Sequence, residues 1–316
     1  MKRKILFSIF FLITGMFVIA QPVKKHGQLK VVGTKLVDAH DQPIALHGMS
    51  LGWHNLWPRF YNAGAVKTLV KDWHCSVVRA AMGVELNDSG YIKNPAGSVA
   101  KIKAVVDAAI KQGIYVIIDF HSHNIKLPEA KIFFEEMATT YGKYPNVIYE
   151  LFNEPDYETW PEVKAYSEEL IKMIRNIDPD NIILVGCPKW DQDIQLPAAD
   201  PIKGYSNLMY TMHFYAGTHK QWLRDRCDEA ITKGLPLFIS ECAGMEASGD
   251  GPIDYAEWNK FVSWMNDKGL SWVAWSVSDK KETCSILNPS AAATGKWKKN
   301  DLKEWGTLTK AALKKY

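Results

Sequence analysis

The chain has 316 residues, with 38 basic and 35 acidic side chains that leave a formal net charge of +3. This balance gives no reason to expect a nucleic acid or an acidic membrane surface as a partner. The length suits one large barrel or two small domains, and neither a Pro/Gly/Ser-rich linker nor a repeat of fixed period divides it. We therefore expect residues 21–316 to form one domain.

Residues 1–20 have the composition of a secretory signal peptide. A basic head over residues 2–4 precedes an apolar run over residues 5–19, and the small residue Ala20 stands before Gln21. A membrane anchor is the alternative, but the apolar run is shorter than the roughly 20 residues of a spanning helix. We expect export to the periplasm or the medium, removal of this segment, and no membrane association afterwards.

Short apolar runs then alternate with longer amphipathic ones. A first hairpin is predicted from residues 28–32 and 34–37. Eight runs with the length and composition of buried parallel strands follow. They cover residues 45–49, 77–81, 115–120, 147–152, 182–185, 208–213, 237–240 and 272–276.

Helices are predicted between these strands. They cover residues 65–72, 99–112, 127–144, 160–177, 218–233, 254–268 and 302–315. Gly113, Gly234 and Gly269 stand where helices should stop, and the Pro- and Asp-rich segment 186–207 predicts a short or irregular helix. Eight such units favour a closed (β/α)8 TIM barrel, with the N-terminal hairpin closing its floor, over a doubly wound open sheet.

Polar side chains stand at the carboxyl ends of nearly all of these strands. A buried strand has little reason to end in a charge, whereas barrel enzymes place their active site at this face. The residues are Arg79, His121, Asn153, Glu154, His213, Tyr215, Glu241 and Trp275.

Glu154 and Glu241 follow the fourth and seventh strands, on opposite sides of the ring. Hydrolysis of a glycoside needs such a pair, because one acid protonates the leaving oxygen and one carboxylate attacks the anomeric carbon or activates water. A separation of about 5 Å favours direct attack and retention, and about 6.5 to 9.5 Å favours inversion through water. The sequence leaves this distance open.

The neighbours of the two carboxylates suggest separate roles. Asn153 is placed to hold the sugar 2-hydroxyl, a contact that strengthens as the oxocarbenium ion forms. Arg79 is the nearest candidate cation to keep the pKa of Glu241 low, and Tyr215 could hydrogen-bond the same carboxylate. Arg79 could equally be a buried salt-bridge partner, and strand alternation leaves open which way Glu150 points.

No metal or cofactor is predicted. His121, His123 and His213 show no ligand spacing, and the cysteines form no zinc pattern. Their odd number leaves at least one thiol unpaired within the chain, and packing as small hydrophobic side chains is expected. The cysteines are Cys75, Cys187, Cys227, Cys242 and Cys284.

These motifs resemble clan A of the glycoside hydrolases and, within it, family 5. The resemblance rests on Asn153-Glu154-Pro155 after the fourth strand and on Glu241, which follows Leu237-Phe238-Ile239-Ser240 on the seventh strand. Segments 48–50, 78–82, 115–119 and 275–280 resemble the bacterial endoglucanase branch, so the likeness spans nearly all of residues 21–316 in order. Family members commonly carry Trp where this chain has Phe120 and Cys242, so local packing should differ there.

The resemblance implies a metal-independent, retaining enzyme on a (β/α)8 barrel, with Glu154 as acid/base and Glu241 as nucleophile. Around the cleaved sugar it places Arg79, His121, Asn153, His213, Tyr215 and, as a platform under the ring, Trp275. Along the rest of the groove it places His54, Trp57, Lys280 and Glu282 on the non-reducing side and Trp190 on the leaving-group side. The matches at His54 and Trp57 are loose, because the loop over residues 51–61 differs in length.

We therefore expect residues 21–316 to be the catalytic domain of a monomeric endo-β-1,4-glucanase that acts on cellulose, soluble β-glucan or cello-oligosaccharides. Trp57, Trp190 and Trp275 would line an open cleft, at about a kcal/mol for each stacking contact. The same chemistry on mannan, xyloglucan or mixed-linkage glucan is the alternative, since one barrel hosts several activities by changing loops. A sugar-binding protein without catalysis is a further alternative, which the presence of both carboxylates disfavours.

Overall fold

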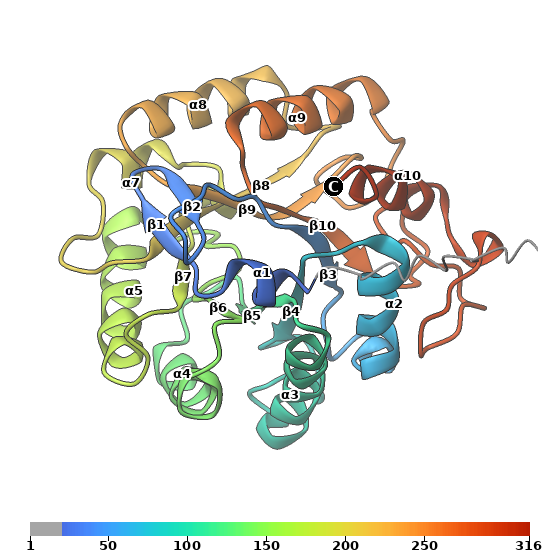
Figure 1. Ribbon diagram of the computed structural model, residues 1–316, viewed down its shortest axis with the longest axis horizontal. Coiled ribbons are helices and arrows are strands. Elements are labelled where there is room, and N and C mark those ends of the chain that lie inside the picture. Colours follow the sequence, from blue (N-terminus) through green and yellow to red (C-terminus); the bar gives the residue numbers. More distant parts are fainter. Residues whose placement is uncertain (1–20) are drawn as a thin grey trace, which may run out of the picture.

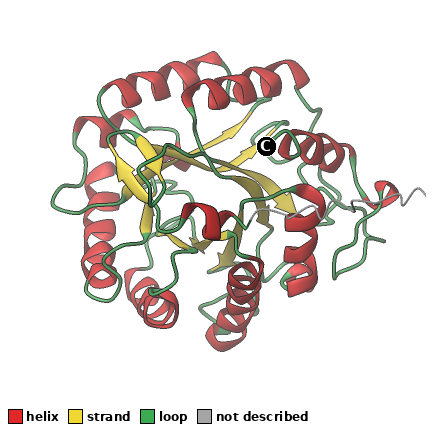
Figure 2. Ribbon diagram, viewed as in Figure 1, coloured by secondary structure: helices red, strands yellow, loops and turns green. Residues whose placement is uncertain are grey.

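A computed structural model describes residues 21–316, and the predicted signal peptide lies outside the described residues. Eight parallel strands pair in the order β10-β3-β4-β5-β6-β7-β8-β9 and close into a barrel, with the helices arranged as a ring around them (Figures 1 and 2). The predicted (β/α)8 barrel is confirmed, and an open sheet is excluded because the last barrel strand pairs with the first. Within residues 21–316, no helix has the length and apolar character needed to cross a membrane.

The barrel strands are short runs rich in β-branched and aliphatic residues. Both of their faces are covered, which is why all their residues are buried and no polar alternation marks them. The strands are β3 His47–Leu51, β4 Val77–Gly83, β5 Tyr115–His121, β6 Val147–Glu150, β7 Ile182–Val185, β8 Leu208–Tyr215, β9 Leu237–Ala243 and β10 Trp272–Val277.

Most strands continue past their predicted carboxyl ends, because the polar residues there still pair with the neighbouring strand. His213 on β8, for example, pairs with Glu241 on β9. Strand β6 is shorter than predicted and ends at Glu150. Beyond it the chain turns, so that Phe152 packs against Tyr166 outside the barrel, with ring centroids 5.2 Å apart. This turn brings the following residues over the mouth of the barrel.

The helices begin and end at recognisable signals. The Asn62 side chain caps α2 by accepting hydrogen bonds from two backbone N–H groups, and Gly113 and Gly269 end α3 and α9 in the left-handed conformation. The connection after β7 contains two short helices, where one short or irregular helix was predicted. The helices are α2 Ala63–Trp73, α3 Pro95–Gln112, α4 Leu127–Tyr141, α5 Trp160–Arg175, α6 Pro188–Asp191, α7 Gln195–Ala199, α8 Gln221–Thr232, α9 Tyr255–Lys268 and α10 Glu304–Leu313, with 3-10 turns at Pro58–Phe60 and Lys299–Asp301.

The N-terminal segment closes the floor of the barrel, as predicted. A short helix, α1 (Pro22–His26), precedes the antiparallel hairpin of β1 (Lys30–Val32) and β2 (Lys35–Val37). Leu29 and Leu36 from this segment pack with apolar side chains near the amino ends of the barrel strands. This plug leaves the opposite, carboxyl end of the barrel as the open face.

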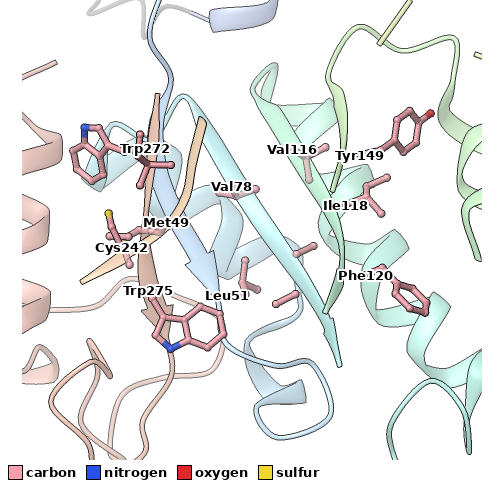
Figure 3. Packing of buried hydrophobic residues seen from close by; sticks show 14 of the residues in the cluster. Met49, Leu51, Val78, Val116, Ile118, Phe120, Tyr149, Cys242, Trp272 and Trp275 are labelled. Atoms are coloured by element: carbon pink, nitrogen blue, oxygen red, sulfur yellow. The ribbon is translucent and has the colours of Figure 1, made fainter. Parts of the chain in front are cut away.

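The larger part of the core lies between the strands and the helices. Figure 3 shows outward-facing side chains of this layer, among them Val78, Ile118, Phe120 and Cys242. Phe120 and Cys242 are fully buried on this side, so the two departures from the family pattern concern packing against helices. Within residues 21–316, all five cysteines are free thiols and buried.

Candidate active site

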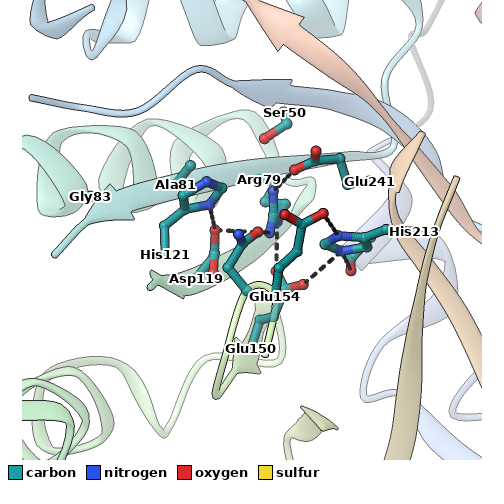
Figure 4. Close-up of polar contacts among 12 residues, drawn as sticks. Ser50, Arg79, Ala81, Gly83, Asp119, His121, Glu150, Glu154, His213 and Glu241 are labelled. Carbon is teal, nitrogen blue, oxygen red and sulfur yellow. Dashed lines mark hydrogen bonds and ion pairs between the residues drawn. The ribbon is translucent and has the colours of Figure 1, made fainter. Parts of the chain in front are cut away.

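Arg79 is the centre of a polar layer above the barrel floor (Figure 4). Its side chain on β4 is fully buried. Nε donates to Glu150 at 2.6 Å, Nη1 donates to Glu241 at 3.0 Å, and Nη2 lies 3.0 Å from Asp119. Arg79 is therefore a buried salt-bridge partner, as the sequence allowed, and it contacts one member of the carboxylate pair. It lies behind the carboxylates rather than on the surface of the site.

Glu241, near the end of β9, receives two hydrogen bonds. Arg79 donates to one carboxylate oxygen, and the Tyr215 hydroxyl on β8 donates to the other at 2.6 Å. The predicted contact between Tyr215 and Glu241 is present. With both oxygens fixed, the carboxylate has one orientation relative to the mouth of the barrel.

Glu154 stands opposite, beyond the end of β6. Its carboxylate contacts His213 Nδ1 at 2.9 Å and lies 3.7 Å from His123. The side chain is 14% exposed, compared with 5% for Glu241, so Glu154 is the more accessible of the two. One oxygen of Glu154 and one of Glu241 lie within 4.8 Å of each other.

At that separation the charge of each carboxylate affects the pKa of the other. Glu154, His213 and Glu241 each offer one atom within 4.8 Å of the others, a spacing at which a cation could also sit. A cation there would lie close to the Arg79 guanidinium, which is already 3.0 Å from Glu241 and repels like charge. We therefore interpret the group as a carboxylate pair. Carboxyl groups this close titrate in coupled steps, because one charge disfavours the other.

The pKa of Glu241 differs from the sequence-based prediction. Burial raises the pKa of Glu241, and the Glu154 carboxylate adds to this increase, while His213, Arg79 and Tyr215 act in the opposite direction. The net pKa is above its ordinary value, so the prediction that Arg79 holds it low is wrong. The reason is that burial and the Glu154 carboxylate together outweigh His213, Arg79 and Tyr215.

The pKa of Glu154 is shifted in the opposite direction to that of Glu241. Burial raises its pKa, but the hydrogen bond and the charge of His213 outweigh burial and bring the pKa below its ordinary value. Burial lowers the pKa of His213, yet the surrounding carboxylates raise it well above its usual range, with Asp191 first among them. His213 and Glu154 therefore form one proton-sharing unit.

Asn153, His121 and Trp275 complete the inner site. Asn153 accepts from Arg79 Nη2 at 2.7 Å through Oδ1, which leaves its buried Nδ2 donor without a partner. The His121 ring lies parallel to that of Trp275, with centroids 5.4 Å apart, and its Nδ1 is 2.6 Å from Asp119. The structure thus brings all the residues predicted around the cleaved sugar to one end of the barrel.

His54 does not belong to this site. Its side chain is 2% exposed and both ring nitrogens are used, by Ser98 Oγ at 2.8 Å and by the Gly83 N–H at 2.9 Å. The predicted substrate contact of His54 is therefore wrong. The half-buried Trp53 faces the site instead, with its ring centroid 4.4 Å from that of His121. A Cβ on Gly83 would come within 2.9 Å of Trp53, so glycine permits this approach.

The remaining predicted residues lie on loops at the rim. Trp57 is half-buried, and its ring covers Gly52 close to Ser278. Lys280 and Glu282, on the loop after β10, form an ion pair with each other. Trp190, after β7, is 42% exposed, and its backbone N–H donates to Pro155 at 2.9 Å, next to Glu154. Their contacts with a sugar stay predictions.

Three buried acids at the site were not predicted as site residues. Asp119 and Glu150 contact Arg79, and Asp191 Oδ2 lies 3.4 Å from His213 Nε2. Asp119 and Glu150 could have been recognised from the sequence, because each is an acidic residue within an apolar strand. Asp191 could not, because a polar residue in a Pro- and Asp-rich segment is typical of a surface loop.

The closed barrel and the facing carboxylates at its carboxyl end define a protein of the barrel glycosidase type. The family model for cellulase (glycosyl hydrolase family 5) matches residues 37–281. The chain belongs to glycosyl hydrolase family 5, and the resemblance noted from its motifs is confirmed.

Individual relatives agree with this assignment. An endoglucanase from Clostridium saccharobutylicum is 44% identical over 294 residues, which cover 91% of this chain and 65% of that protein. Endoglucanase Z from Dickeya dadantii is 42% identical over 286 residues, with 88% and 66% covered. The chain thus spans just under two thirds of the length of these two relatives.

Solved structures match over nearly their whole length. A structure from Cytophaga hutchinsonii has a TM-score of 0.91 at 43% identity, with 93% of this chain and 96% of that one covered. The catalytic domain of an endoglucanase from Thermobifida fusca has a TM-score of 0.87 at 31% identity, with 93% and 99% covered.

Proposed function

We propose that this protein is a retaining endo-β-1,4-glucanase with Glu241 as nucleophile and Glu154 as acid/base. The observation that carries the proposal is the separation of the two carboxylates, whose nearest oxygens lie within 4.8 Å. Retaining glycosidases keep their carboxyl groups about 5 to 5.5 Å apart, whereas inverting ones need about 6.5 to 9.5 Å to admit water. A gap this narrow leaves no place for a water between Glu241 and the anomeric carbon.

In the first step a Glu241 oxygen attacks the anomeric carbon, the glycosidic bond breaks, and Glu154 gives its proton to the leaving oxygen. The pair needs one proton for this step. His213 Nδ1, at 2.9 Å from Glu154, is close enough to share this proton with the Glu154 carboxylate. A glycosidic oxygen that enters beside the more accessible Glu154 offers this proton an acceptor. In the second step Glu154 takes a proton from water, which attacks the same carbon and releases Glu241.

Asn153 supports the first step. Its unpartnered Nδ2 donor is buried beside the carboxylates, and a buried donor without an acceptor is costly. A sugar 2-hydroxyl is the acceptor that the proposal provides. Arg79 fixes the amide by donating to its oxygen, so the NH2 group can only point away from Arg79.

Several aromatic side chains at the mouth of the barrel favour a polymeric sugar. Trp53, Trp57, Trp190 and Trp275 lie at or near the open face and are partly or slightly exposed. A chain of several β-linked glucose units fits such a row better than a single sugar. A solved complex of the Thermobifida fusca endoglucanase catalytic domain contains cellotetraose, and that domain is 31% identical to this chain.

Substrate and stereochemistry are tested together. We expect faster initial rates on carboxymethylcellulose than on galactomannan, with lichenan as a third comparison. Proton NMR of early products should show the β-anomer first. A clear preference for galactomannan would contradict the glucanase assignment, and initial α-anomer would contradict retention.

The two roles are tested with paired variants. Glu154→Gln should slow an aryl cellobioside with a poor leaving group at least a hundredfold and an activated dinitrophenyl one far less, because a good leaving group needs no protonation. Glu241→Ala should abolish hydrolysis while cello-oligosaccharide binding remains measurable by calorimetry. Glu229→Gln, on the outer helix α8 and exposed, is the control. Equal losses on both aryl substrates would remove the acid role from Glu154.

The proposal includes export. It is supported by the composition of residues 1–20 and is tested by N-terminal sequencing of protein from the periplasm and medium of an expressing cell. We expect the mature chain to begin at Gln21. Retention of full-length protein in the cytoplasm would contradict this part.

A further inference from the structure

The segment after β7 has an unusual backbone. Lys189, Trp190 and Asp191 follow one another with φ values of 54°, 54° and 60°. The left-handed region costs residues with a Cβ roughly 1 to 2 kcal/mol each, and asparagine and aspartate adopt it more easily than lysine or tryptophan. Such a conformation persists when the surrounding contacts hold it, and it is found at functional sites. Here it turns Trp190 toward solvent and Asp191 into the barrel.

Asp191 is fully buried, although it follows an exposed tryptophan. Its Oδ1 accepts a hydrogen bond from the Cys187 backbone N–H. Its Oδ2 has no hydrogen-bond partner of good geometry, and the cation nearest to it is His213, whose Nε2 is 3.4 Å away. Burial raises the pKa of Asp191 well above its ordinary value, whereas His213, the Cys187 N–H and the Thr211 hydroxyl act in the opposite direction. An apolar side chain would fill the same space at lower cost, so a carboxyl group here calls for a role beyond packing.

The imidazole of His213 joins Asp191 to Glu154. Its Nδ1 lies 2.9 Å from Glu154, and its Nε2 lies 2.9 Å from Ser240 Oγ and 3.7 Å from Glu150. The segment that carries Asp191 also contacts the loop that carries Glu154, which we call the acid/base loop. The Trp190 N–H donates to the Pro155 carbonyl of this loop at 2.9 Å. The segment therefore braces the acid/base loop through its backbone and the acid/base side chain through His213.

We propose that Asp191 is a positioning residue for the acid/base, which acts through His213 by holding the ring against Glu154 and by keeping a proton in the His213–Glu154 pair. This inference rests on the proposed function. Asp191 itself touches no sugar. Its carboxylate makes the pair bind a proton more tightly, so that Glu154 can still act as an acid at higher pH.

Other charged groups also face the His213–Glu154 pair. These groups are the same in all the variants compared below. Glu150 and Glu241 act in the same direction as Asp191 on His213. Arg79 and His123 favour the ionised form of Glu154, and His219 lies close enough to interact with both. The remaining neighbours of Asp191 are the Cys187 thiol and the Thr211 hydroxyl.

The direction of the effect follows from the charge. An anion beside a proton-sharing pair raises the pKa of the pair, and its removal lowers that pKa. The alkaline limb of kcat/KM reports loss of the acid proton in the free enzyme. Removal of the Asp191 charge should therefore move the alkaline limb to lower pH by about one unit, a tenfold loss of kcat/KM on that limb.

The test compares Asp191→Asn with the unmodified protein over a full pH range. Asparagine keeps an acceptor for the Cys187 N–H and tolerates the left-handed conformation, so the turn is retained. Asp191→Ser also lacks the charge and is used if the first variant does not fold. The matched control is Asp193→Asn, in the same segment, where the side chain pairs with Arg226 at 2.7 Å. A phenyl cellobioside is the substrate, because its poor leaving group requires the acid.

A second measurement does not depend on activity. Nitrogen NMR of labelled histidine gives the titration midpoint of His213 in each variant. We expect a lower midpoint and an earlier alkaline limb in Asp191→Asn, and neither change in Asp193→Asn. Unchanged midpoint and limb would overturn the inference. So would a uniform loss of activity at every pH with an unchanged midpoint, because that result shows only a structural role. If the unmodified protein hydrolyses no β-glucan, the proposed function fails, and the midpoint alone still decides the role of Asp191.

Discussion

Replacement of Arg79 by methionine tests how the polar layer is held together. The variant removes one guanidinium that is fully buried and contacts Glu150, Glu241, Asn153 and Asp119 at 2.6 to 3.0 Å. Methionine has a similar length and fills irregular space, so the main change is the loss of charge and donors. Three carboxyl groups would then be buried without their shared cation.

The expected loss of stability follows from that burial. Removal of one partner from a buried ion pair costs about 3 to 5 kcal/mol, because an uncompensated charge remains. For a domain of this size, at about 2 °C per kcal/mol, the melting temperature should fall by about 6 to 10 °C at neutral pH. The loss should exceed that of any exposed ion pair.

The loss should also depend on pH. Burial raises the pKa of Glu150, but Arg79 and His213 outweigh burial and bring it below its ordinary value. The stabilisation is therefore present above the unfolded pKa, about 4.3, and is lost as pH falls through the lower folded pKa. In Arg79→Met the cation is gone, so Glu150 favours its protonated form. The difference between the two proteins should be large at pH 7 and shrink toward pH 4.

Melting curves at pH 7 and pH 4 for both proteins measure these values. Arg226→Met is the control, since Arg226 is also paired with an aspartate, at 2.7 Å, but its side chain is 31% exposed. That variant should lose about 1 kcal/mol or less, or about 2 °C. Equal losses in the two variants, or a loss for Arg79→Met that does not change with pH, would refute the reasoning.

Three further outcomes are expected. Tyr215→Phe removes the 2.6 Å hydrogen bond to Glu241 and should lower kcat/KM on carboxymethylcellulose about 10- to 150-fold; a loss under twofold would contradict it. Trp53→Ala should raise KM on cellotetraose about fivefold with little effect on kcat, whereas Trp222→Ala, exposed on α8, should change neither. Phe134→Ala, fully buried behind the strands, should cost about 3 to 5 kcal/mol in denaturant unfolding, and a loss below 1 kcal/mol would show that the site repacks.

The sequence by itself determined the fold and singled out the two carboxylates that the structure brings together. Strand and helix periods are local properties, and a charge at the end of a buried strand points to the open face of a barrel. That reasoning placed Glu154 and Glu241 correctly at one face, with Tyr215 bound to Glu241. The family assignment followed from the same motifs.

Only the tertiary structure decided the distances and the directions of loops. The gap between the carboxylates depends on where two separate strands end around the closed ring, which no local pattern encodes. The loop after β3 turns His54 inward, where its ring accepts from the Gly83 N–H, and it turns Trp53 toward His121 at the site. Arg79 was expected to contact one carboxylate and forms ion pairs with three. Asp191 was not recognised, because it lies in a segment with the composition of a surface loop. These outcomes arise from contacts between elements distant along the chain, where packing and shared charge override local preference.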